Sequence, residues 1–317
     1  MKTWKKVGVT ALAGSMVALS AQAVDVAVTG SMVMTYTGDS GAQDNGVDGG
    51  RWGMSKAVAL SGSGEMDNGW TVSLTNSNLQ GSAANISIDM GDAGTLKFQN
   101  VSGGLGIGTI DDMMPTANEE VWDGMETAAT GLVSGGNNGF QYSNSAGGAT
   151  FLVGYAIKGD AAQGGGVNGS TGSGSDLSFA VKFSPMDGLN VGGGVGSVGT
   201  ADSSKDDDHD TIYATYAMGS FTVGVQQSNI DYAASGSNDE ESTAFGISFA
   251  VNDDLSISYG QWNTDDTGTV DEEVKGVSVG YSMGGMTVKA HKNSGDGLAN
   301  TASQSSEHTE IAISWAF

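Results

Sequence analysis

The last eight residues, Glu310-Ile311-Ala312-Ile313-Ser314-Trp315-Ala316-Phe317, alternate between bulky apolar side chains at odd positions and small or polar ones at even positions. Successive side chains of a β-strand point to opposite faces, so this period of two separates the two sets. The same alternation recurs upstream, at residues 151–157, 177–183, 221–225, 245–251, 255–259 and 277–281. None of these segments has the apolar spacing of a helix. The sequence therefore predicts an all-β protein.

Tight turns alternate with longer polar connections between these strands. Asp67-Asn68-Gly69 and Gly284-Gly285 are examples of the tight turns, which tolerate the positive φ of short hairpins. The longer connections lie near residues 38–50, 80–84, 103–136, 159–175, 200–209, 229–240, 265–272 and 294–305. Seven tight turns and these eight connections join about 16 strands, an even number that suits a closed antiparallel barrel.

The two faces of the predicted strands differ in composition. One face carries large apolar residues and the other mostly Gly, Ala, Ser, Thr, Asn and Gln, while charge is concentrated in the connections. A barrel of about 16 strands is too wide for side chains to fill, so the small polar face must surround water. We therefore expect a transmembrane antiparallel β-barrel with lipid outside. Aromatic residues near the tight turns fit one interfacial girdle: Trp70, Phe140, Phe151, Phe221, Tyr281, Trp315 and Phe317.

The first 23 residues have the features of a signal peptide. Three lysines precede an apolar stretch at residues 7–19, and Ala21-Gln22-Ala23 has the small-x-small form of a cleavage site. About 13 apolar residues fall short of the roughly 20 that a transmembrane helix needs. The prediction is a signal peptide at residues 1–23, followed by a single barrel domain at residues 24–317.

The composition limits the partners and the sources of stability. The chain has 36 acidic residues, 12 basic residues and a net charge of −24, so nucleic acid is a poor partner. It has no Cys, so an exported protein of this size must depend on its hydrogen-bonded sheet rather than on disulfides. The mean hydropathy of −0.14 is compatible with a membrane barrel, because only alternate residues meet lipid.

No pattern in the sequence supports an enzyme or a required cofactor. His209, His291 and His308 are too few and too scattered in the sequence for a confident metal site or catalytic triad. One acidic run could bind Ca²⁺ through hard oxygen ligands: Asp206, Asp207, Asp208 and Asp210. A calcium site needs ligands that converge from several segments, so we favour a solvated acidic loop and keep Ca²⁺ binding as the alternative.

Three parts of the sequence resemble a known family. Residues 24–30, residues 51–70 and the terminal Phe317 are similar to the general diffusion porins of Gram-negative bacteria, in the style of the sixteen-stranded trimeric porins of purple non-sulphur bacteria. A final Phe after alternating apolar residues is similar to the signal read by the outer-membrane assembly machinery. The resemblance implies a homotrimer in the outer-membrane lipid of a Gram-negative bacterium, and passive diffusion of small hydrophilic solutes and ions.

The resemblance also implies that the third long loop folds into the lumen and narrows it. That loop, at residues 103–136, has no Lys or Arg and has six acids that we expect to face water: Asp111, Asp112, Glu119, Glu120, Asp123 and Glu126. Such porins set basic residues on the wall opposite the loop. Strand parity points Lys97 and Lys182 inward, and Arg51, the only Arg in the chain, lies at the outer edge of the second strand. The excess of acid predicts a preference for cations.

Two other functions fit a lipid-facing barrel. A substrate-specific outer-membrane channel would often have an aromatic track on its inner wall, whereas most aromatics here have outward parity. An adhesin or structural anchor would have large or paired charged side chains plugging its lumen. Both remain alternatives to a diffusion channel at this point.

Overall fold

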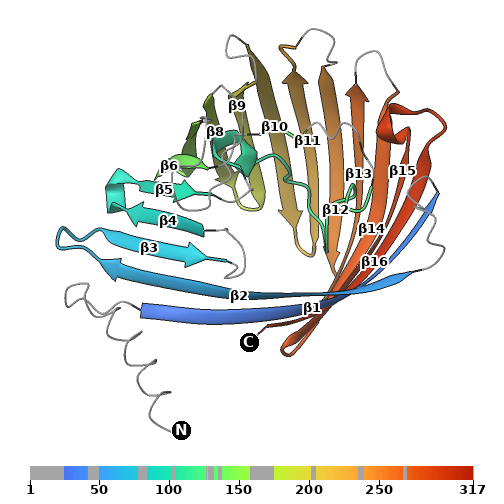
Figure 1. The fold of residues 1–317 in the computed structure, drawn as a ribbon, viewed down its shortest axis with the longest axis horizontal. Coiled ribbons are helices and arrows are strands. Elements are labelled where there is room, and N and C mark those ends of the chain that lie inside the picture. Colours follow the sequence, from blue (N-terminus) through green and yellow to red (C-terminus); the bar gives the residue numbers. More distant parts are fainter. Residues whose placement is uncertain are drawn as a thin grey trace, which may run out of the picture.

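The computed structural model describes sixteen β-strands that close into one antiparallel barrel (Figure 1). The described residues are 25–41, 50–77, 84–100, 104–125, 127, 132–134, 138–157, 175–200, 205–234, 239–266 and 270–316. Each strand pairs with its neighbours in the chain, and β1 also pairs with β16. The all-β prediction and the strand number of about 16 are confirmed. The predicted signal peptide, at residues 1–23, lies outside the described residues.

The two longest strands, β1 and β2, lie beside the point where the barrel closes, and β3 to β5 are the shortest. Their bounds are β1 Asp25–Gly41, β2 Arg51–Glu65, β3 Thr71–Asn76, β4 Ala84–Asp89, β5 Thr95–Gln99, β6 Gly139–Ala146, β7 Ala149–Ile157, β8 Ser175–Met186, β9 Leu189–Gly199, β10 Asp206–Met218, β11 Phe221–Asp231, β12 Glu240–Ala250, β13 Leu255–Asp266, β14 Glu272–Met283, β15 Met286–Asp296 and β16 Ser305–Ala316. Three short 3₁₀ turns accompany them: η1 Gly91–Ala93, η2 Gly106–Thr109 and η3 Leu298–Asn300. No helix in the described part of the chain is long and apolar enough to cross a membrane.

The alternation seen in the sequence separates an outer from an inner face. On β11, Val223 and Val225 are exposed on the outside, whereas Gln226 and Ser228 are buried on the inside. Phe221, on the outer face next to the turn, stacks on Phe249 with ring centroids 4.5 Å apart. Large exposed apolar side chains on the outside are what a lipid environment requires.

The aromatic girdle is confirmed in part. Trp70, Phe221, Tyr281 and Trp315 are exposed near the tight-turn end of their strands. The sequence predicts that Phe140 belongs to the same girdle, and this prediction is wrong. It lies at the start of β6, after the longest loop, and packs on Phe98 with ring centroids 5.0 Å apart.

The longest connection, between β5 and β6, is folded inside the barrel. We call residues 100–138 the inner loop. Figure 1 shows its described part, with η2, inside the ring of strands. Leu105, Ile107 and Ile110 are fully buried although they belong to a loop, because η2 packs against β7, β8 and β9. The prediction that the third long loop enters the lumen is confirmed.

The outer face can be tested with two adjacent residues of β3. Leu74 is exposed on the outside, whereas Ser73 faces the lumen. We expect Leu74→Arg to lower the free energy of unfolding in lipid vesicles by on the order of 2–4 kcal/mol, because the charge would meet hydrocarbon. Ser73→Arg should change it little. Denaturant titration followed by tryptophan fluorescence measures both, and equal losses for the two variants would contradict the assignment of faces.

Candidate functional site

The inner loop is fixed to the wall at its start by an apolar cluster. Ile107 and Ile110 of the loop pack with Val133, near the end of the loop, against Leu152 of β7 and Tyr213 of β10. All five side chains are almost inaccessible to solvent. Each large apolar side chain buried in this way contributes on the order of 1.5–3 kcal/mol. The start and the end of the described loop are therefore held on the same patch of wall.

A second apolar cluster holds the far part of the loop. Trp122 and Met125 of the loop pack against Trp262 of β13, Val274 of β14 and Leu298 of η3. The rings of Trp122 and Trp262 meet edge to face, with centroids 4.7 Å apart. Between the two clusters the loop crosses the inner side of β10 to β14, so its path is defined at both ends.

Side-chain amides of the wall satisfy the backbone of the loop. Nε2 of Gln226 donates to the carbonyls of Ile110 and Asp111, at 2.9 and 2.8 Å, and its Oε1 accepts from the N–H of Met113 at 2.9 Å. Irregular backbone inside a barrel needs such partners, because a buried backbone group without one costs free energy.

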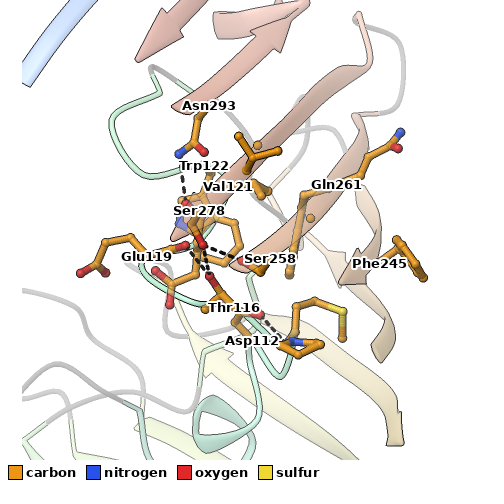
Figure 2. A pocket seen from close by; sticks show the side chains of 17 residues that line it. Asp112, Thr116, Glu119, Val121, Trp122, Phe245, Ser258, Gln261, Ser278 and Asn293 are labelled. Carbon is orange, nitrogen blue, oxygen red and sulfur yellow. Dashed lines mark hydrogen bonds between the residues drawn. The ribbon is translucent and has the colours of Figure 1, made fainter. Parts of the chain in front are cut away.

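Further round the barrel, serine hydroxyls of the wall also form hydrogen bonds with the loop. The N–H of Ala117 donates to Oγ of Ser258 at 3.0 Å, and the hydroxyls of Ser258 and Ser278 lie 2.5 Å apart. Figure 2 shows these serines facing Thr116 across a narrow pocket between the loop and the wall. Nδ2 of Asn293 then donates to the carbonyls of Glu120 and Asp123, at 3.2 and 3.0 Å.

A row of glycines in the wall makes room for the loop. Gly224, Gly246 and Gly260 are register partners on β11, β12 and β13. A Cβ at Gly224 or Gly246 would lie 2.6 or 2.9 Å from Cδ of Pro115, and one at Gly260 would lie 2.8 Å from Cγ1 of Val121. The sequence predicts that inward glycines line water. At these positions they instead permit close contact with the loop.

The structure describes five of the six predicted acids, and Glu126 lies outside the described residues. Glu119 is exposed, and Figure 2 shows it pointing away from the wall strands. Asp111 and Asp112 are only partly exposed, and Oδ1 of Asp112 accepts from the N–H of Met114 at 3.0 Å. The expectation that all these carboxylates face water freely is therefore too simple.

Partial burial changes the charge of these carboxyls. The pKa of Asp112 is raised to about 7, mainly by burial and also by the nearby charges of Glu120 and Asp111, while the hydrogen bond from Met114 lowers it. Burial is also the main reason why the pKa values of Asp111 and Glu120 are raised. The net negative charge of the inner loop therefore increases as the pH rises through neutrality.

The three predicted bases do not form one wall opposite the loop. Lys182 lies under the loop, where its Nζ donates to the carbonyl of Thr109 at 3.2 Å. This position differs from the prediction because the loop runs along β8 instead of across from it. Arg51 forms an ion pair with Asp39 at 3.0 Å. Lys97 faces the lumen on β5, between Ser87 and Gln141 in the register.

The predicted calcium cluster lies in a strand rather than in a loop. β10 begins at Asp206 and pairs with β9 as far as Gly199, because backbone pairing extends the sheet beyond the predicted boundary. Alternation then places Asp206, Asp208 and Asp210 on one face and Asp207 on the other. The four carboxylates therefore do not converge within one strand. Calcium binding by these residues remains an untested prediction.

Two of the three histidines meet, although the sequence separates them. His291 on β15 and His308 on β16 have ring centroids 5.3 Å apart, and Asp123 of the inner loop lies beside them. Both histidines have inward parity on neighbouring strands, which is the signal that could have paired them. The sequence separates these two histidines by 16 residues, but the structure brings them together.

Comparison with known proteins agrees with the fold. A family model described as Gram-negative porin matches residues 8–288. None of the curated proteins matches the chain significantly in sequence.

Solved porins share the architecture at low sequence identity. A porin refined at 1.8 Å superposes with a TM-score of 0.69 at 13% identity, covering 92% of this chain and 100% of that chain. The anion-selective porin from Comamonas acidovorans gives 0.65 at 16% identity, covering 93% and 100%. Outer-membrane OmpT of Vibrio cholerae gives 0.66 at 15%, covering 94% and 99%. At these identities the similarity shows the fold alone.

The glycine row predicts the effect of one added side chain. We expect Gly246→Val to push the loop off the wall, to destabilise the protein by about 1–3 kcal/mol and to make single-channel currents noisier. Gly53→Val on β2 is the control, because a Cβ there meets nothing within 4 Å. Planar-bilayer recording and denaturant unfolding measure the two effects. Identical behaviour of the two variants would show that Gly246 does not seat the loop.

Proposed function

The chain belongs to the Gram-negative porin family, whose members are integral β-barrels of the outer membrane, and on this premise we propose a water-filled channel that prefers cations. Small hydrophilic solutes and ions would cross it by passive diffusion. It would require no cofactor and catalyse no reaction. The excess of acidic over basic residues in the inner loop is the observation that supports a preference for cations.

Acid exceeds base where the lumen is narrowed. The inner loop has no Lys or Arg in its sequence, and its described part holds the five acids named above. Arg51 is paired with Asp39, and Lys182 lies beside Asp111, so both bases have acidic neighbours. Acidic groups around a constriction favour cations. A porin with the same fold is anion-selective, so the barrel alone does not imply a preference for cations, and the proposal depends on the charged side chains.

The wall on the open side of the lumen suits unspecific diffusion. Ser63, Ser73 and Ser87 follow one another in the register of β2, β3 and β4, and Lys97 comes next on β5. A row of small hydroxyls offers hydrogen bonds to any polar solute without a shaped site. Tyr213 and Trp262 have inward parity but are 3% exposed, because the loop covers them. These two rings cannot form the aromatic track of a substrate-specific channel.

One outward lysine supports assembly into a homotrimer. Lys56 is the sixth of the 15 residues of β2 and lies on the same face as Met54 and Val58, and it pairs with Met32 of β1. A lysine in contact with lipid near the middle of the bilayer costs on the order of 2–4 kcal/mol. Contact with another protomer would remove this cost. Channel closures in three equal steps would support the trimer, and single-step closures would contradict it.

The preference for cations can be measured by reversal potential under a salt gradient. We expect cation selectivity in the unmodified protein and about half that permeability ratio in Glu119→Gln, because a neighbouring charge near the ion path is worth a fraction of 1 kcal/mol in water. Asp67→Asn, in the turn between β2 and β3, is the control that removes a charge outside the lumen. Anion selectivity of the unmodified channel would refute the proposal.

The pKa of Asp112 predicts a pH dependence. Because burial raises that pKa to about 7, the carboxyl is neutral below this pH and charged above it. Cation selectivity should therefore rise as the pH increases from about 6 to about 8. Asp112→Asn should remove most of this rise, although Asp111 and Glu120 also titrate above their usual range. An unchanged rise in Asp112→Asn would show that another group controls it.

A further inference from the structure

We propose that Asp123, His291 and His308 form a site for a first-row transition-metal ion such as Zn²⁺, which ties the inner loop to β15 and β16. One oxygen of Asp123 and one nitrogen of each histidine lie within 4.8 Å of one another. The three ligands come from a loop and two neighbouring strands, so they converge from different segments. This convergence is what distinguishes the site from the acidic run on β10.

Both histidines have an inaccessible nitrogen with no hydrogen-bond partner. His291 is 3% exposed and His308 is 6% exposed, and Nε2 of each ring is buried and unpartnered. A buried polar atom without a partner costs about 1–3 kcal/mol, so two of them facing one carboxylate need an explanation. A bound cation would satisfy both nitrogens at once.

The separation of the ligand atoms fits a small tetrahedral ion. Nε2 of His291 lies 3.4 Å from Oδ2 of Asp123, too far for a good hydrogen bond between them. Two atoms that share a tetrahedral ion at zinc bond lengths of roughly 2.0–2.1 Å lie about 3.3 Å apart. The ligand nitrogen of His308 lies within 4.8 Å of the other two ligand atoms. Two imidazoles and one carboxylate favour zinc or its neighbours over Ca²⁺ and Mg²⁺, which prefer oxygen ligands.

A carboxylate behind His308 holds that ring in the tautomer that a metal requires. Nδ1 of His308 lies 2.5 Å from Oδ1 of Asp39, so its N–H donates to that carboxylate and leaves Nε2 free to bind. Asp39 is itself fixed by Arg51. Nδ2 of Asn118 lies 2.8 Å from Nδ1 of His291. Binding of a metal through Nε2 of His291 requires this amide to turn over, so that its oxygen accepts from Nδ1–H. Such partners orient the histidine ligands of zinc sites.

The loop is shaped to bring Asp123 over the two rings. Gly124 has a positive φ of 73°, and a Cβ there would lie 2.3 Å from Cγ of His308. Only glycine fits this conformation and this contact. Asn293 holds the carbonyl of Asp123 from the other side, at 3.0 Å. The carboxylate is therefore placed by the backbone of the loop rather than by chance rotation of an exposed side chain.

A metal ion here would alter the constriction in two ways. It would fix the loop to β15 and β16, and it would add two positive charges beside the acids of the loop. We expect micromolar Zn²⁺ to lower the cation selectivity and the current noise of the channel, and a chelator to reverse both. This effect on the current rests on the proposed channel function, whereas metal binding itself does not.

Equilibrium dialysis of the folded full-length protein against Zn²⁺ tests the site directly. We expect one tightly bound Zn²⁺ per chain, with affinity reduced about a hundredfold or more in Asp123→Asn and His308→Gln, and about tenfold or more in Asp39→Asn. His209→Gln is the matched control, because His209 lies on β10 beside Ser134 and away from the site. It should bind as the unmodified protein does.

Two further measurements separate the site from unspecific binding. Cu²⁺ in place of Zn²⁺ should give an electron paramagnetic resonance spectrum with two nitrogen ligands, and Ca²⁺ at the same concentration should not compete. If Asp123→Asn and His308→Gln, both shown to be folded by their heat-dependent migration in SDS gels, bind Zn²⁺ as tightly as His209→Gln, the proposal is wrong. A channel that conducts in chelator yet binds no Zn²⁺ would overturn the site and leave the channel function standing.

Discussion

Every backbone N–H and C=O inside the hydrocarbon of a membrane must have a hydrogen-bond partner within the protein, and the rest of this structure depends on that constraint. The pairing of β1 with β16 completes the ring of sixteen strands, so the described strands satisfy one another without a free edge. Closure lets the outer face be almost wholly apolar. It also allows the inner face to be polar, because water reaches it.

The width of the ring explains the inner loop. Sixteen strands enclose more space than wall side chains can fill, so a segment of irregular backbone can enter the lumen and remain partly in contact with water. The loop is nevertheless not a free chain. One apolar cluster holds the start and the end of its described part, and a second holds its far part. Gln226 and Asn293 bind its carbonyls, and the glycine row lets it approach the wall closely. The size of the opening therefore depends on contacts between the loop and the wall as much as on the barrel.

The same contacts determine the electrostatics of the constriction. A loop that packs closely on the wall draws some of its own acids out of water, which is why Asp112 is partly neutral near pH 7 while Glu119 is exposed. It also brings Asp123 to the two histidines on β15 and β16. Position along the loop thus separates carboxylates with different surroundings: Glu119 is exposed, Asp111 and Asp112 are partly buried, and Asp123 lies beside a pair of imidazoles.

The sequence by itself determined the elements and their faces, because a period of two is a local property that each strand displays in its own residues. It determined the approximate strand number, the outward direction of the aromatics, although not the end of the barrel at which Phe140 lies, and the acidity of the long loop. Only the tertiary structure decided where that loop lies on the wall. This placement puts Lys182 beneath the loop. It also brings Pro115 into close contact with Gly224 and Gly246. Asp123 comes to lie beside His291 and His308 for the same reason. Such contacts link residues far apart in the chain, and they follow from strand register and loop path, which no local pattern records.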